Sequence, residues 1–144
     1  MTTTAPIRRP PGATGRAGYL AGAIVNGMLL LAVNVWPGWQ VLPFLTAQTS
    51  QVLGLVNLSL SVGLLTNLAY LARHPGPVRA IGDLVTLIVG GLSLISIWQV
   101  FPFDFGDAAF DWALVVRILL LVAIIGTGIG IVAQLVSRLR GSKQ

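Results

Sequence analysis

The sequence contains no cysteine, no glutamate and a single histidine, His74. The absence of cysteine excludes disulfides, thiolate nucleophiles and cysteine metal sites. The lone histidine lies beside prolines in a turn, and no Ser–His–Asp set for nucleophilic catalysis can be assembled around it. The sequence therefore predicts a protein that is not an enzyme, with no cofactor and no metal site.

Charged residues are also scarce, at 9% of 144 residues, while 55% are hydrophobic and the mean hydropathy is +0.85. A soluble domain has about 25% charged residues. Four long apolar runs account for the difference, at 18–36, 52–71, 80–100 and 112–136. Each has about the 20 residues with which a helix crosses ~30 Å of hydrocarbon. The sequence predicts an all-α integral membrane protein with four transmembrane helices in a lipid bilayer.

The segments outside the apolar runs are short. Residues 1–17 are rich in threonine, proline and glycine, with three arginines, and are predicted to be a disordered N-terminal tail. The transmembrane domain is predicted to span 18–137, and 138–144 to be a basic C-terminal tail. The run Pro75-Gly76-Pro77 predicts a turn between the second and third helices, because proline lacks the amide that a helix interior needs.

Basic residues are distributed unevenly along the chain. Eight of the nine lie before the first helix, around the turn between the second and third helices, or after the fourth: Arg8, Arg9, Arg16, Arg73, Arg79, Arg138, Arg140 and Lys143. The other two loops carry no basic residue. The positive-inside rule then predicts a multi-pass protein of the cell (plasma) membrane with both termini in the cytoplasm. The same pattern explains the net charge of +5 without a nucleic-acid partner.

All four tryptophans and all five phenylalanines lie in or beside the two loops predicted to be outside. One interpretation is an aromatic belt at the headgroup level, although belts usually occupy both faces. The alternative is a cap over the helices or a surface for a partner. The candidate residues for this partner surface are Trp39, Phe44, Trp98, Phe103, Asp104 and Asp107.

One hexapeptide occurs twice, as WQVLPF at 39–44 and WQVFPF at 98–103. An offset of 59 aligns the first helix and loop with the third helix and its loop, and an offset of 60 aligns the second helix with the fourth. Each unit has two crossings, so both have the same orientation. The pattern predicts two tandem helical hairpins, about 18–72 and 79–137, as a parallel internal repeat with a pseudo-twofold axis along the membrane normal.

Ionisable and amide side chains within apolar runs are the candidate functional residues. Arg117 is either an anchor at the outer interface or a charge that faces a ligand or ion path. Asp83 is either the partner of Arg79 in an i,i+4 pair or a proton-relay acid. Asn57 aligns with Arg117 in the repeat, which favours inward positions for both. Asn26 could form hydrogen bonds between helices.

Two further polar features leave alternatives open. Small residues on one face of the third and fourth helices predict either close helix packing or a solvated polar seam. Asp104, Asp107 and Asp111 could bind a hard cation, but their spacing matches no calcium loop, and Asp111 is predicted to cap the fourth helix.

Two functions fit these observations. The first is a non-catalytic scaffold or accessory subunit of a membrane complex, which binds a membrane protein partner or a second copy of itself. The alternative is a small channel or transporter subunit, with a polar path between the two repeats or at a homodimer interface.

Overall fold

The computed structural model describes residues 13–72 and 77–141. Four long helices account for most of them: α1 (Ala13–Asn34), α2 (Thr49–Ala72), α3 (Pro77–Val100) and α4 (Trp112–Gly141). A short 3-10 helix, η1 (Trp39–Val41), follows α1. All four long helices are long and apolar enough to cross a membrane, as predicted. The predicted tail residues 1–12, Arg73, His74 and Lys143 lie outside the described residues.

The ends of the helices differ from the predicted ends by a few residues. Helix α1 already begins at Ala13, within the stretch assigned to the tail, and α4 continues to Gly141 through most of the predicted basic C-terminal tail. Helix α3 begins at Pro77. A helix accepts proline at its first position because the amide there has no partner within the helix.

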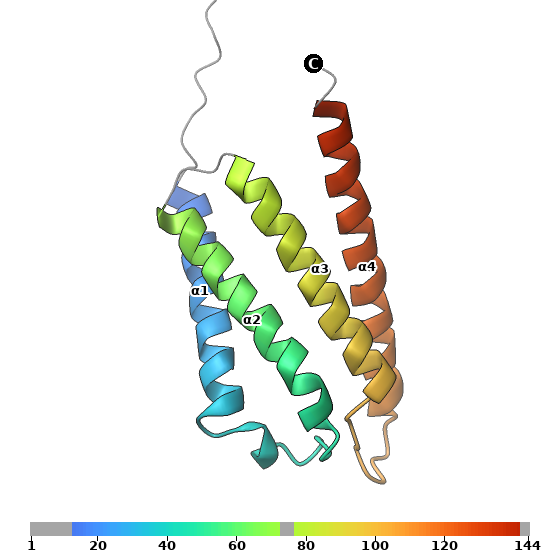
Figure 1. The fold of residues 1–144 in the computed structure, drawn as a ribbon. Helices are drawn as coiled ribbons and strands as arrows, with labels where there is room; N and C mark the ends of the chain where they lie inside the picture. The colour runs from blue at the N-terminus through green and yellow to red at the C-terminus, as the bar shows by residue number, and fades with distance from the viewer. Residues whose placement is uncertain (1–12, 73–76, 142–144) are drawn as a thin grey trace, which may run out of the picture.

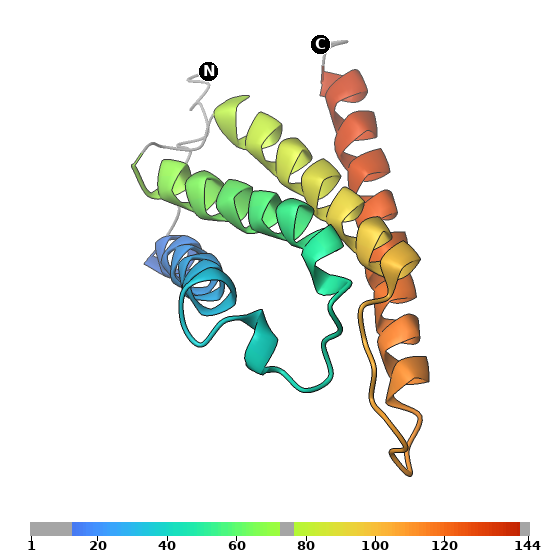
Figure 2. The ribbon, with the colours of Figure 1, turned by 60° about the horizontal axis from the view of Figure 1, so that its bottom comes forward.

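The four helices form an open row (Figure 1). Within the described residues the backbone of α1 runs beside that of α2, α2 beside α3 and α3 beside α4, whereas the backbone of α1 lies close to neither α3 nor α4. Figure 2 shows the same order from another direction. The two loops, 35–48 and 101–111, lie at the same end of the helix axes, here called the loop end. The start of α1, the end of α2, the start of α3 and the end of α4 lie at the opposite, terminal end (Figure 1).

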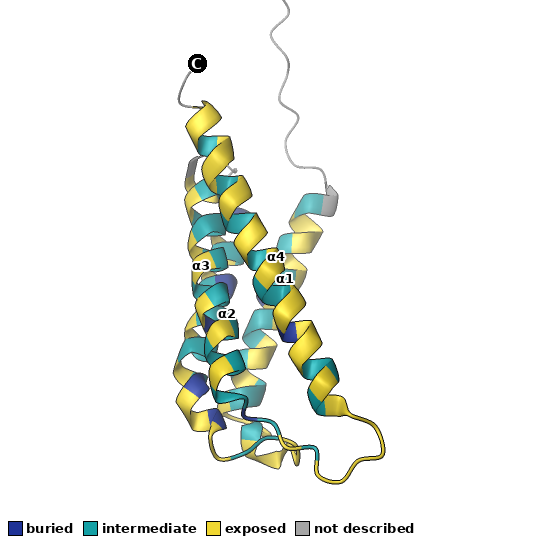
Figure 3. Cartoon of the chain, turned by 90° about the vertical axis from the view of Figure 1, so that its right-hand side faces the viewer, coloured by how far each residue is buried: buried dark blue, intermediate teal, exposed yellow. Residues whose placement is uncertain are grey.

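Few described side chains are buried (Figure 3). The buried hydrophobic residues are Ala23, Val52, Tyr70 and Leu120, and exposed leucine, isoleucine and valine side chains cover all four helices. Soluble monomers rarely expose apolar patches larger than a few hundred Å². Lipid is the surrounding that would cover such a surface, so the composition and the fold together describe a small four-span membrane protein.

The two copies of the hexapeptide adopt different structures. Residues Trp39–Val41 form η1 after α1 has ended, whereas residues 98–100 form the last turn of α3. The reason lies just before each copy. Pro37 and Gly38 precede the first, and Gly38 has a φ of +88°, which breaks the helix. Their counterparts at 96–97 are serine and isoleucine, which continue α3.

The helix pairs α1–α2 and α3–α4 also pack in different registers. Asn67 of α2 lies against Gly22 of α1. Thr127, the counterpart of Asn67 in the predicted repeat, lies against Gly91 and not near Ile81, the counterpart of Gly22. The pseudo-twofold relation between the two hairpins therefore stays a prediction.

Candidate functional site

The two hairpins are joined directly at the loop end. Leu45 and Phe103 form an antiparallel β-bridge. The amide of Thr46 donates to the carbonyl of Pro102 at 3.0 Å, and the amide of Asp104 donates to the carbonyl of Phe44 at 2.9 Å. The side chain of Pro102 is fully buried. The Pro-Phe dipeptides that end the two hexapeptides thus lie side by side at an isolated β-bridge, an arrangement that the repeat alone did not specify.

Aromatic rings pack on this bridge. The ring of Phe105 lies nearly parallel to those of Phe44 and Phe103, with centroid distances of 5.9 and 6.1 Å. Phe101 meets Phe103 edge to face at 5.4 Å. Such pairs contribute about 0.5–1.5 kcal/mol each beyond the area that they bury. We call segments 43–46 and 101–105 together with Trp112 the loop-end cap. It contains Phe44 and Phe103 from the predicted partner surface, whereas Trp39 lies outside it, in η1.

Phe101 has a strained backbone, with a φ of +43°. Its amide donates to the carbonyl of Ile97 at 2.8 Å and so ends α3, in the position where glycine is usual. The left-handed conformation costs a side chain of this size about 1–2 kcal/mol. The packing of the cap offsets that cost. Strained residues of this kind cluster at functional sites, and no pattern in the sequence marked Phe101.

Arg117 lies over the aromatic rings at the end of α3. Its guanidinium carbon is 4.1 Å from the centroid of Phe101 and 5.6 Å from that of Trp98. The side chain is exposed, so it fits the role of an interface anchor better than that of a charge on an enclosed path. Asn57, its counterpart in the predicted repeat, lies on a different interface, where it pairs with Asn34 of α1.

The aspartates of the second loop have separate roles. Asp104 accepts a hydrogen bond from the amide of Gly106 at 2.9 Å, and Asp107 is exposed. Asp111 accepts from the amide of Leu114 at 2.9 Å, which confirms the predicted cap of α4.

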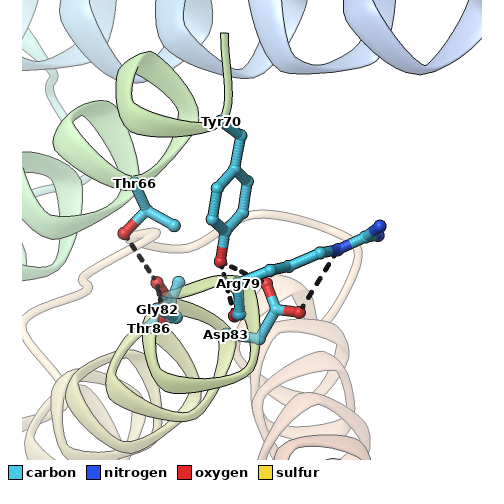
Figure 4. Close-up of polar contacts among 6 residues, drawn as sticks. All are labelled: Thr66, Tyr70, Arg79, Gly82, Asp83 and Thr86. Carbon is cyan, nitrogen blue, oxygen red and sulfur yellow. Dashed lines mark hydrogen bonds and ion pairs between the residues drawn. The ribbon is translucent and has the colours of Figure 1, made fainter. Parts of the chain in front are cut away.

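A second polar cluster lies at the terminal end, between α2 and α3 (Figure 4). The hydroxyl of Tyr70 lies 2.8 Å from the carbonyl oxygen of Arg79 and 2.9 Å from Oδ1 of Asp83, and donates its proton to them. The Nε of Arg79 is 3.7 Å from Oδ2 of Asp83, so the predicted i,i+4 pair is present. Asp83 lies in the second turn of α3, later than its predicted place at the start of the helix.

The same cluster holds three helices together. The ring of Tyr19 in α1 meets Tyr70 edge to face at 5.2 Å, and the guanidinium of Arg79 lies 5.8 Å from the Tyr19 centroid. Gly82 lets Tyr70 approach, since a Cβ there would be 2.5 Å from its hydroxyl oxygen. The partners of Asp83 are Tyr70 and Arg79, which hold the helices together. The cluster therefore resembles a structural contact between helices more than a proton relay.

Asn26 and Asn67 pack at the interface between α1 and α2. Asn26 donates to the carbonyl of Gly22 at 2.8 Å, and Asn67 donates to that of Gly63 at 2.7 Å. Each amide also lies against the glycine of the other helix. A Cβ on Gly63 would be 2.8 Å from the Asn26 amide oxygen, and one on Gly22 would be 2.7 Å from that of Asn67. A Gly-x-x-x-Asn pattern at 22–26 and 63–67 was the signal available in the sequence.

The chain matches no protein-family model, no curated protein and no solved structure.

Proposed function

We propose that this chain is a non-catalytic scaffold or accessory subunit of a membrane complex. The observation that carries the proposal is the open row, in which the edge helices α1 and α4 do not contact each other. In a closed bundle the apolar helix faces would pack against one another. An open row leaves one long face of α1 and one of α4 for lipid, for a membrane protein partner or for a second copy.

The loop-end cap supports the same proposal. The β-bridge between Leu45 and Phe103 orders the cap in the absence of a partner. Exposed rings lie at its margin, among them Trp112 and Phe110. Binding to a surface that is already ordered avoids much of the entropic cost of arranging side chains and loops. Aromatic residues are enriched at the cores of protein interfaces.

The contacts between the two hairpins give less support to a channel or transporter. A polar path between them would need solvated space between α2 and α3. The hydroxyls of Thr66 and Thr86 instead lie 3.3 Å apart across that interface, and Tyr70 reaches the first turns of α3. These polar side chains are engaged in helix packing.

Purification from the native host in mild detergent tests the scaffold role, with chemical crosslinking before extraction. We expect one stable partner at a fixed ratio, or a homo-oligomer. A monomer without adducts would contradict the proposal. Reconstituted protein provides the opposing test. Proton or ion flux that is lost in Asp83→Asn or Arg117→Ala would replace the scaffold with a transporter.

We also propose that the loop end faces outward and that both termini are cytoplasmic in the plasma membrane. Four of the five described arginines lie at the terminal end, namely Arg16, Arg79, Arg138 and Arg140. Arg117 and the three loop aspartates lie at the loop end. Single-cysteine labelling is direct in this cysteine-free chain. An impermeant maleimide should label Asp107→Cys in intact cells and Ser142→Cys only after lysis, and the reverse order would overturn the orientation.

A further inference from the structure

Two cavities open on the loop-end cap and share one wall. The larger has a volume of about 510 Å³ and reaches from the first loop to the start of α4, and the smaller has about 380 Å³. Asp104, Phe105, Gly106, Ala108 and Trp112 line both of them. Small-molecule sites in proteins have volumes of roughly 300–1,000 Å³. Each cavity is therefore large enough for a small organic ligand.

Aromatic rings form part of the wall of both cavities. Phe44 adds its ring to the larger cavity, and Phe103 and Phe110 add theirs to the smaller one. The stacking of Phe105 between Phe44 and Phe103 holds these rings in place, and Phe110 meets Trp112 edge to face at 5.0 Å. Aromatic faces carry partial negative charge and attract cations, most strongly at tryptophan. The mainly apolar wall of the larger cavity thus favours a ligand that is apolar on its surface and positive in charge.

Asp104 is the one carboxylate that lines the larger cavity, whereas the smaller cavity is lined by both Asp104 and Asp111. Asp104 lines both cavities, and the hydrogen bond from the Gly106 amide to its Oδ1 fixes its side chain. Among the described residues, the ion pair found is the one between Arg79 and Asp83 at the terminal end, and Asp104 takes part in none. Arg117, the arginine nearest in the sequence, lies over Phe101 and Trp98 instead. The charge of Asp104 therefore lacks a cationic partner within the described chain.

The cavities do not fit a hard metal ion. Calcium takes six to eight oxygen ligands that converge on one point. Among the described residues no three histidine, cysteine, aspartate or glutamate side chains come together in a way that could hold a metal. Asp111 is engaged as the cap of α4 through the Leu114 amide, and Asp107 lines neither cavity. The larger cavity, with rings around the single carboxylate of Asp104, suits a bulky alkylammonium group, whose charge is spread over methyl groups.

We propose that the loop-end cap binds a small alkylammonium cation. In the larger cavity the rings of Phe44, Phe105 and Trp112 contact its alkyl groups, and the carboxylate of Asp104 balances its charge. This site does not depend on the scaffold role, because a cap can hold a small cation whether or not the chain has a protein partner. Ligand binding to the cap and association with a protein partner are also measured by different experiments.

The test uses the full chain in maltoside micelles, labelled with 5-fluorotryptophan and followed by ¹⁹F NMR. Choline is the probe, and 3,3-dimethyl-1-butanol is its uncharged counterpart of the same shape. Sodium chloride at equal concentration controls for ionic strength. The resonance of Trp112, assigned by its loss in Trp112→Phe, should shift saturably with choline and little with the alcohol or the salt.

Matched variants locate the charge. Asp104→Asn keeps the acceptor for the Gly106 amide, so the loop keeps its hydrogen bond, and choline binding should weaken by roughly fivefold, the scale of one exposed charge attraction. Asp107→Asn removes the same charge from the same loop outside both cavities and should change binding by less than about twofold. Unchanged resonances of the other tryptophans would show that both variants are folded. Absence of a saturable shift, an equal response to the alcohol, or equal effects of the two variants would each overturn the proposal.

Discussion

The interface between α1 and α2 is built differently from the interface between α3 and α4. The first holds all four asparagines of the chain, Asn26, Asn34, Asn57 and Asn67. Apart from Arg117 over Trp98 at the loop end, the second consists of small and apolar contacts, such as Gly91 against the methyl group of Thr127. In lipid, where apolar helix faces gain little from leaving the solvent, directional hydrogen bonds and close backbone approach decide how helices pair.

This difference between the two interfaces suggests different roles for the two hairpins. The amide contacts of α1 and α2 set one register, because a slip along the helix would place Asn26 and Asn67 against side chains where they now face glycine. The α3–α4 pair has no such contact among the described residues and is fixed by shape and by the cap. Helix α4 is also an edge of the row. We infer that the first hairpin is the rigid support and the second is the side that meets a partner.

The largest expected effect comes from filling a glycine in the first hairpin. Gly63→Ala would bring a Cβ to 2.8 Å from the Asn26 amide oxygen, and moving that amide would break its bond to Gly22. We expect a loss of about 1–3 kcal/mol of stability, the usual cost of overpacking. Equilibrium unfolding with increasing SDS in mixed micelles, followed by tryptophan fluorescence, measures it.

The matched control for this glycine lies on the same helix. Gly54 has no atom within 4 Å of a built Cβ. Gly54→Ala should therefore be neutral or stabilising by up to about 1 kcal/mol through helix propensity. Gly91→Ala in the second hairpin should be intermediate, because the Thr127 methyl is 3.1 Å away. Equal losses at 54 and 63 would remove the difference between the two interfaces.

The next effect concerns the strained end of α3. Phe101→Ala and Phe101→Gly both remove the ring, but only glycine adopts a φ of +43° without a steric cost. The glycine variant should be more stable than the alanine variant by about 1 kcal/mol in the same unfolding experiment. If alanine is equal or better, the backbone of Phe101 is not left-handed and the strain in the cap is absent.

A smaller effect is expected from the paired amides at 34 and 57. Asn34 and Asn57 exchange two hydrogen bonds, at 2.9 and 2.7 Å. Hydrogen bonds between membrane helices average about 0.6 kcal/mol in double-mutant cycles. A cycle with Asn34→Ala and Asn57→Ala should give a coupling of about that size. The pair of Asn57→Ala with Arg117→Ala, residues on different interfaces, is the control and should be additive.

The smallest effect should come from Arg117. Its guanidinium lies over Phe101 and Trp98 on an exposed surface. Exposed cation–π contacts contribute about 0.5–1 kcal/mol. Arg117→Ala should lower stability by that amount, and the loss should shrink when Phe101 is already alanine, because only the longer contact with Trp98 then remains. An undiminished loss in the Phe101→Ala background would mean that Arg117 has another partner.

The sequence predicted the four helices well because a membrane span has a strong signal in its length and hydropathy. It also predicted the cap at Asp111 and the pair of Arg79 and Asp83, which are local contacts along the chain. The sequence did not predict the features that depend on neighbouring residues or on tertiary contacts. Identical WQV segments form different structures because Pro37 precedes only the first, and neither the open row nor the contact of Tyr70 with α3 leaves a periodic signal.

We propose that the cap and the open side of the second hairpin form a partner surface. Photo-crosslinking in the native host tests this proposal, with p-benzoylphenylalanine at Phe110 in the second loop, which is 58% exposed, and at Leu65 on α2, which is 65% exposed, as the control. We expect one discrete adduct from position 110, with a partner or with a second copy, and none from position 65. No adduct at position 110, or the same diffuse products from both positions, would contradict it.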